Sequence, residues 1–132
     1  MFFENQRGLV IKIHTERDVR QQSLNEKRDF LLELLEIMDN FERALSADSD
    51  ANDAWRRGVE AIYRQMLDLL KQHGVQFIHA LGKPFDPHYH EAVSTVINPD
   101  IKDGTIVNEV RRGYMLDGKL LRPSRVQVAV HP

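Results

Sequence analysis

The sequence predicts an α+β fold, in which an N-terminal helical hairpin forms a four-helix bundle by dimerisation and a small β-rich C-terminal domain follows. Glycine and proline divide the chain: only Gly8 and Gly58 precede residue 74, whereas five glycines and all five prolines lie from there on. Proline breaks helices and glycine supplies turns, so helices are expected first and strands and loops afterwards. The spacing of the apolar residues supports the same division, because it is helical in the first part and alternating in parts of the second. We therefore expect a helical dimerisation region at 1–74 and a β domain at 75–132.

Composition excludes several classes of protein. The chain has 132 residues, a formal net charge of −2 and no cysteine. Without a basic excess, general binding to nucleic acid is not expected. The lack of cysteine excludes disulfides, thiolate nucleophiles and cysteine-ligated zinc, and it fits a reducing compartment. The sequence contains no run of 18 apolar residues that would predict a membrane-spanning helix, and its first residues lack the layout of a cleavable signal. We therefore expect a cytoplasmic protein with no membrane partner.

The first expected helix covers the stretch RDFLLELLEIMDNFERAL, and it carries two apolar sets with helical spacing. Together they make a stripe wider than one neighbouring helix can cover. The first set is Phe30, Leu34, Ile37, Phe41 and Leu45, and the second is Leu31, Leu35, Met38 and Ala44.

The second expected helix covers AWRRGVEAIYRQMLDLLKQH and ends before Gly74, a typical residue just past a helix. A two-helix hairpin cannot bury two wide stripes, whereas a four-helix bundle made by two copies can. The alternative is that the β domain covers the exposed stripe. The expected dimer interface consists of Leu34, Ile37, Phe41, Val59, Ile62 and Met66.

Residues 9–29 begin with a β-like pattern and become strongly charged. A helix continued backward from Phe30 carries cations such as Lys12 and Arg17 on faces that are mostly solvated. Such charges usually form a solvated helix surface. The functional alternative is a helix end that faces a partner.

The second part of the chain predicts a small sheet. Short apolar segments at 75–81, 91–98 and 105–110 are strand candidates, and Asp117-Gly118 is the dipeptide typical of a type I′ hairpin turn. From Val126 to Val130, valines alternate with Gln127 and Ala129, as in a half-buried strand. This sheet is too small to bury much core alone, so we expect it to dock on the helices.

The stretch GKPFDPHYHEAV, residues 82–93, raises the question of a metal or acid/base site. His88 and His90 alternate as on one side of a strand, with Glu91 opposite, but two nitrogens and an uncertain third ligand make a weak metal site. An acid/base pair of Asp86 and His90 lacks an accompanying nucleophile or pocket. The favoured interpretation is structural: Asp86 caps a turn and Phe85 plugs it into the core.

Other catalytic signatures are missing from the sequence. GKPFDP lacks the Walker spacing and its closing Lys-Ser/Thr, there is no serine elbow, and no histidine pair has the HExxH spacing. We therefore expect no enzymatic activity, no metal and no cofactor.

Two segments carry a resemblance to a known family. PFDPHYHEAV, followed by RRGYMLDGKLLRPSRVQVAV, resembles the signature of the GrpE family, and residues from about 15 to 130 resemble the family throughout. The two helical stretches resemble the family's bundle helices. The matching positions in the two segments are Phe85, Asp86, His90, Ala92, Val93, Gly113, Tyr114, Gly118, Leu121, Arg122, Ser124, Val126 and Val128.

The resemblance implies a function that involves no covalent chemistry. GrpE proteins are homodimeric nucleotide exchange factors, co-chaperones of the bacterial chaperone DnaK in protein folding and the stress response. The β domain, the wing, is expected to bind a lobe of the DnaK nucleotide-binding domain and to hold its cleft open so that ADP leaves. The exchange factor can shift this equilibrium only by the difference between its affinities for the open and closed states.

The expected chaperone contacts are carried over by position from the family. Gly58 lies inside a helix, where glycine costs roughly 1 kcal/mol relative to alanine, so it is expected to allow a close approach by the chaperone or within the dimer. Lys12 and Arg17 correspond to the long-helix contact. The wing contacts are Pro84, Val110, Lys119 and Val128.

A second hypothesis comes from a departure from the family pattern. Family members have a long paired helix that runs to an arginine-rich stretch, whereas this chain has LVIKIH at residues 9–14. The alternative function is therefore a dimeric helical-bundle scaffold, or a degenerate paralogue without exchange activity.

Overall fold

A computed structural model describes residues 2–4, 10–12, 15–47 and 53–132 of the chain. The chain divides into two compact units, residues 1–34 and 35–132, and each is described by itself. Residues 9, 13 and 14 of the LVIKIH segment, and most of the connection between the two helices, lie outside the described residues.

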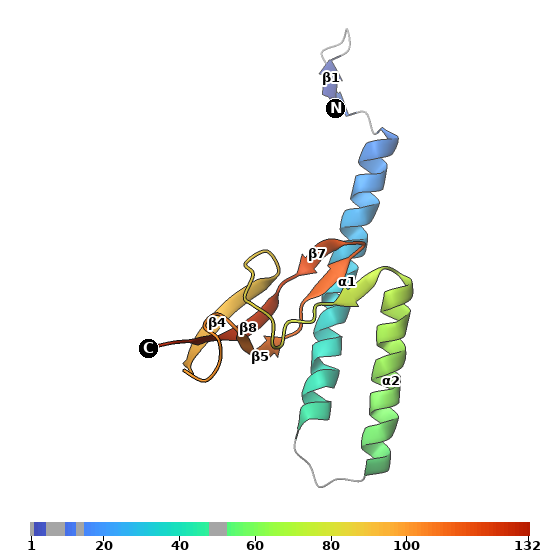
Figure 1. Ribbon diagram of the computed structural model, residues 1–132. Helices are drawn as coiled ribbons and strands as arrows, with labels where there is room; N and C mark the ends of the chain where they lie inside the picture. The colour runs from blue at the N-terminus through green and yellow to red at the C-terminus, as the bar shows by residue number, and fades with distance from the viewer. Residues whose placement is uncertain (1, 5–9, 13–14, 48–52) are drawn as a thin grey trace. The chain divides into compact units, whose positions relative to one another are not determined.

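The first unit contains a short β-hairpin and the start of the first helix. Strand β1 (Phe2–Glu4) pairs antiparallel with β2 (Val10–Lys12). Helix α1 (Glu16–Ser46) follows, drawn in blue at its start in Figure 1. A reciprocal cap fixes its first turn: the Asp18 N–H donates to Oγ1 of Thr15 at 3.2 Å, and the Thr15 N–H donates to the Asp18 carboxylate at 3.3 Å. The helix expected to continue backward from Phe30 is therefore confirmed to residue 16, but the expectation that it also carries Lys12 is wrong, because Lys12 belongs to β2.

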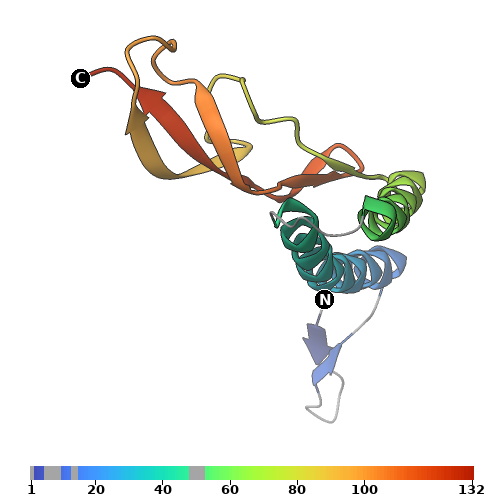
Figure 2. The ribbon, with the colours of Figure 1, turned by 90° about the horizontal axis from the view of Figure 1, so that it is seen from below.

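The second unit begins with the remainder of α1 and helix α2 (Asp53–Gln72), which lie side by side (Figures 1 and 2). The Arg56 guanidinium joins them by donating to the carbonyls of Leu45 and Ala47. Gly74 ends the second helix with a φ of 83°, as its position predicts. The predicted antiparallel hairpin is confirmed.

The β domain contains two three-stranded sheets. The first has the order β3-β6-β7 and is antiparallel throughout. Its strands are β3 (Val75–Phe77), β6 (Tyr114–Leu116) and β7 (Lys119–Arg122). Asp117 and Gly118 between β6 and β7 have φ of 49° and 80°, so the predicted type of turn is confirmed. The expected strand at 75–81 is too long, because a turn at 80–83 takes its last residues out of the sheet.

The second sheet has the order β4-β8-β5, visible in Figure 2. Strand β8 lies in the middle, parallel to β4 and antiparallel to β5. The strands are β4 (His90–Ile97), β5 (Ile106–Arg111) and β8 (Ser124–Val130).

The apolar core of this sheet consists of Ala80, Ile106, Val126 and Val128, with Ile78 and Phe85 packed against it. The packing of Phe85 confirms the structural interpretation of the 82–93 stretch. Ala129 is also fully buried. The expectation of a half-buried last strand is confirmed from Ser124 to Val128, where buried and more accessible residues alternate, and only the burial of Ala129 departs from it.

Irregular backbone shapes the strands beside β8. The β4 register shifts between Ala92 and Ser94, and the β5 register shifts again between Glu109 and Arg111. A bulge leaves one residue unpaired and re-aims its neighbours. At Gly113 a side chain cannot fit, because a Cβ there would lie 2.3 Å from the backbone nitrogen of Ser124. This close approach brings the end of β5 and the start of β8 together.

Candidate functional site

The predicted dimer residues lie on the two helices, and the described part of the chain leaves their side chains partly or largely exposed. Ile37 and Ile62 are 52% and 51% exposed, whereas Leu35 and Met38 are fully buried. Of the second apolar set in α1, only Ala44 is exposed and the other three residues are buried, whereas the first set is available to a partner. Phe41 and Leu34 are half-buried, as are Val59 and Met66, and the exposed Trp55 and Leu69 extend the same spacing along α2.

The predicted wing contacts differ in accessibility. Pro84 is exposed beside its bridge to Thr105, and Lys119 is exposed directly after the β6–β7 turn. Val110 is 57% exposed because it occupies the bulge in β5. Val128 is only 6% exposed and belongs to the core, so it has little surface for a partner.

The predicted helix contacts lie on separate elements. Arg17 is exposed in the first turn of α1, while Lys12 ends β2 and its side chain lies outside the described residues. Gly58 is exposed on α2, and a Cβ at this position meets nothing within 4 Å in the described part of the chain. Packing within one copy therefore does not explain this glycine.

An ion-pair network that the sequence analysis missed connects α1 to the β domain. The Arg122 guanidinium is 4% exposed and donates to both carboxylate oxygens of Asp39, at 2.8 Å and 2.5 Å. Its Nε donates to the carbonyl of Arg112 at 2.9 Å. Nε of Arg111 lies 3.6 Å from the same Asp39 carboxylate.

A second cluster lies about one helical turn further along α1. The Tyr63 hydroxyl donates to Glu42, and the Arg112 guanidinium lies 3.2 Å from both the Glu42 carboxylate and the Tyr63 hydroxyl oxygen. Burial and the bond to Glu42 raise the pKa of Tyr63, so this hydroxyl stays protonated. Arg112 also stacks over the Phe77 ring, with Cζ 4.2 Å from the ring centroid.

Glu109 extends this cluster, but the burial of its carboxylate is unfavourable. Its Oε2 is buried without a hydrogen-bond partner among the described residues, and its Oε1 lies 3.7 Å from Nε of Arg112. Burial raises the pKa of Glu109, and the nearby Arg112 only partly offsets this.

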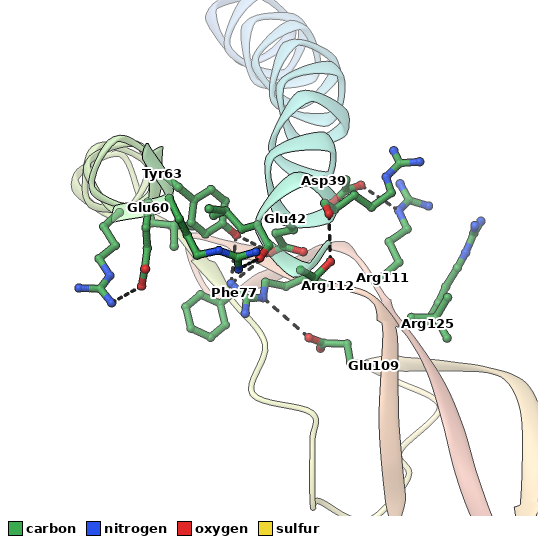
Figure 3. Close-up of a pocket in the computed structure, with 16 residues that line it drawn as sticks. Asp39, Glu42, Glu60, Tyr63, Phe77, Glu109, Arg111, Arg112 and Arg125 are labelled. Atoms are coloured by element: carbon green, nitrogen blue, oxygen red, sulfur yellow. Dashed lines mark hydrogen bonds and ion pairs between the residues drawn. The ribbon is translucent and has the colours of Figure 1, made fainter. Parts of the chain in front are cut away.

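These side chains border an open groove of about 1030 Å³ between the helices and β5 (Figure 3). In the close-up, Glu42, Tyr63 and Arg112 point toward one another. Most charged groups here already have partners, so the groove wall is an internal junction. Its sequence signals are weak: an aspartate next to a buried helix position, and an arginine directly after two leucines.

The 82–93 stretch contains a turn that its own side chains cap, as the structural interpretation predicts. The Asp86 carboxylate accepts the His88 N–H at 2.9 Å, and this bond and that of the His88 ring lower the pKa of Asp86. Nδ1 of His90 accepts the Asp86 N–H at 3.0 Å, and burial lowers the pKa of His90. His88 lies in the turn before β4, so the expected alternation of His88 and His90 along one strand is wrong. Among the described residues, no three His, Asp or Glu side chains gather as a metal site.

The comparison with known protein families now adds to this geometry. The model of the GrpE family matches residues 7–130. The chain belongs to the GrpE family. A GrpE protein of Parageobacillus thermoglucosidasius is 38% identical over 117 residues, which cover 87% of this chain and 52% of the relative.

Two further GrpE relatives agree. The GrpE protein from Geobacillus thermodenitrificans is 43% identical over 99 residues, which cover 74% of this chain and 45% of the relative. The GrpE protein from Thermotoga petrophila is 39% identical over 116 residues, which cover 88% of this chain and 66% of the relative. The chain thus spans about half the length of the first two GrpE relatives. No described helix is both long and apolar enough to cross a membrane.

Proposed function

We propose that the chain is a nucleotide exchange factor that acts on a DnaK-type chaperone in protein folding and the stress response. The observation that carries this proposal is membership of the GrpE family over residues 7–130. The protein binds the nucleotide-binding domain of the chaperone, favours its open cleft and so lets ADP leave. This role needs no covalent chemistry and no cofactor, and we place it in the cytoplasm.

The proposed assembly is a homodimer whose helical region, residues 1–74, forms a four-helix bundle. The uncovered apolar face of the hairpin supports it: Ile37, Trp55, Ile62 and Leu69 are all at least half exposed in one copy. Isolated exposed apolar residues are ordinary, but a row with helical spacing along both helices is typical of a bundle seam. A second copy covers both rows at once.

The proposed chaperone-binding surface is the wing, residues 75–132. Pro84, Val110 and Lys119 are exposed, so all three are available to a partner. We leave Val128 out, because its side chain belongs to the core. Three further chaperone contacts remain proposed because of their positions in the family: Lys12, Arg17 and Gly58.

The test is the release of a fluorescent ADP analogue from a DnaK-type chaperone, followed by stopped flow. We expect the wild-type protein to accelerate release. Lys119→Glu slows association, because a charge at the rim of an interface mainly tunes the association rate and its salt dependence. The matched control is Lys102→Glu, which changes another exposed lysine, in the β4–β5 loop and outside the three proposed contacts of the wing, and leaves the rate unchanged.

The outcomes separate the proposal from its alternatives. A dimeric wild-type protein that leaves ADP release unchanged contradicts exchange activity and favours the scaffold hypothesis. Equal rates for Lys119→Glu and Lys102→Glu, with exchange intact, contradict only the role of the β6–β7 turn.

A further inference from the structure

The junction between α1 and the wing contains one buried arginine, Arg122, each of whose three nitrogens donates a hydrogen bond across it or beside it. Both terminal nitrogens of Arg122 donate to Asp39, and its Nε donates to the carbonyl of Arg112. A guanidinium that binds a carboxylate with two parallel bonds fixes direction as well as distance, because both groups are planar. The pair therefore defines an angle between the helix and the β domain.

The β side of this junction is rigid. Arg122 ends β7, Pro123 follows with its restricted φ, and Ser124 is fully buried at the start of β8. The Ser124 hydroxyl accepts the N–H of Gly113 at 3.1 Å. A change of angle at Arg122 is therefore transmitted to both sheets.

The helix side offers two attachment points. Asp39 binds Arg122, and Glu42, three residues later on the same face of α1, binds Arg112 and Tyr63. Two points hold an orientation, whereas one point allows rotation about itself. Losing the Asp39 bonds leaves only the Glu42 cluster and the core contacts to hold the wing.

Stability alone is a poor reason for this arrangement. Removing a guanidinium and a carboxylate from water is costly, and apolar residues of similar volume often stabilise a protein equally well. What an apolar pair lacks is the directional fork. We infer that Asp39 and Arg122 are positioning residues that hold the wing at the angle required for nucleotide exchange.

This inference rests on the proposed function in one respect. An exchange factor shifts the chaperone only by binding its open state better than its closed state. A wing that rotates freely can follow its binding lobe into the closed state as well. Binding then persists while the preference for the open state falls, so the maximal rate of ADP release decreases even when the chaperone is saturated.

Wing orientation can be measured directly. The chain has no cysteine, so Asp68→Cys on α2 and Lys102→Cys in the β4–β5 loop give two exposed sites for spin labels. Mixing labelled protein with an excess of unlabelled protein leaves most labelled dimers with one labelled copy. Double electron–electron resonance then reports the distance between helix and wing within that copy.

We expect Asp39→Asn to broaden this distance distribution and to lower the maximal rate of ADP release about 10-fold. Arg122→Lys keeps the charge but loses the fork, so it provides a second variant if Asp39→Asn fails to fold. The matched control is Glu91→Gln, which removes the exposed 3.5 Å ion pair to Arg125 within one sheet. Circular dichroism and light scattering check fold and dimer for each variant.

An unchanged distance distribution in both folded variants overturns the inference. So does a broadened distribution with an unchanged maximal rate, provided that the wild-type protein accelerates release. If the wild-type protein does not accelerate release, the proposed function fails, while the distance measurement still tests whether the pair fixes the wing.

Discussion

The helical hairpin and the β domain treat their apolar residues differently. In the β domain, Ile106, Val126 and Val128 close a core with Ala80, and its exposed apolar residues lie mainly on the edge strand β4 and on loops. In the hairpin, the exposed apolar residues form continuous rows along α1 and α2. The β domain thus buries a core with its own residues, whereas the described residues leave an apolar face of the hairpin exposed.

The difference between the two regions is tested most strongly by placing a charged side chain on the exposed apolar surface of each. Ile62→Asp places a carboxylate in the proposed bundle seam, where dimerisation buries it without a partner. Because Ile62 is half exposed in one copy, the change costs little before assembly. We expect the dissociation constant of the dimer to rise at least about 100-fold, as measured by analytical ultracentrifugation.

The control for this charge is Ile97→Asp at the end of β4, where the side chain is 68% exposed. It should leave the dimer intact. Equal dissociation by both variants, or a wild-type protein that is monomeric with full helicity, contradicts the proposed seam.

The second prediction concerns the core of the β domain. Ile106→Ala removes a side chain that is 1% exposed and leaves a cavity among Ala80, Val126 and Val128. We expect the free energy of unfolding of this domain to fall by about 3 kcal/mol, without dissociation of the dimer. Urea unfolding followed by circular dichroism measures it, and a loss below about 0.5 kcal/mol contradicts the assigned core.

The third prediction concerns the pH dependence of the β domain. Burial lowers the pKa of His90 below its ordinary value of 6.5, so the unfolded chain binds a proton more readily than the folded chain. The stability is fully present above pH 6.5 and is lost as the pH falls toward the folded pKa. In His90→Gln this loss is absent, whereas His73→Gln, an exposed control, retains it.

Thermal unfolding between pH 5 and pH 7.5 checks the third prediction. We expect the free energy of unfolding of the wild-type protein to fall as the pH decreases through this range. Parallel pH profiles for the wild-type protein and His90→Gln would show that another group is responsible.

The smallest expected effect belongs to Glu109. Burial raises its pKa above the ordinary 4.5, so its ionised form, present above the folded pKa, costs stability. Glu109→Gln should therefore raise the free energy of unfolding at pH 7 slightly, as measured by urea unfolding. This advantage should shrink as the pH falls through the folded pKa and should lose its pH dependence below 4.5.

The matched control for Glu109 is Glu91→Gln, because Glu91 is exposed and also faces an arginine. Destabilisation by Glu109→Gln at pH 7 would show that the Arg112 contact outweighs the cost of burial.

Most of the fold could be predicted because local patterns determine it. Gly74 and the Asp117-Gly118 turn adopt the positive φ that their positions predict. The two apolar sets of α1 were also visible, but spacing alone could not show that Leu35 and Met38 point inward while Ile37 remains exposed. That assignment depends on where the second helix and the β domain lie, which spacing does not encode.

The junction could not be predicted, because it depends on long-range pairing. Asp39 and Arg122 are far apart in the sequence, and neither belongs to a short motif that indicates an ion pair. Val128 failed as a surface residue for a related reason. The alternation of β8 showed that Val126 and Val128 share a face, but only the packing of that face against Ile106 shows that it is the buried one.

The position of β8 between β4 and β5 also has a consequence during synthesis of the chain. The two earlier strands have no pairing with each other, because each pairs with β8. At about 5–20 residues per second, the ribosome takes a few seconds to add the residues from Asn98 to Val130 after β4 is complete. During that time the backbone N–H and C=O groups of β4 have no strand to pair with. The second sheet can thus close only after its last strand, Ser124–Val130, has been made, so its formation comes at the end of synthesis of this domain.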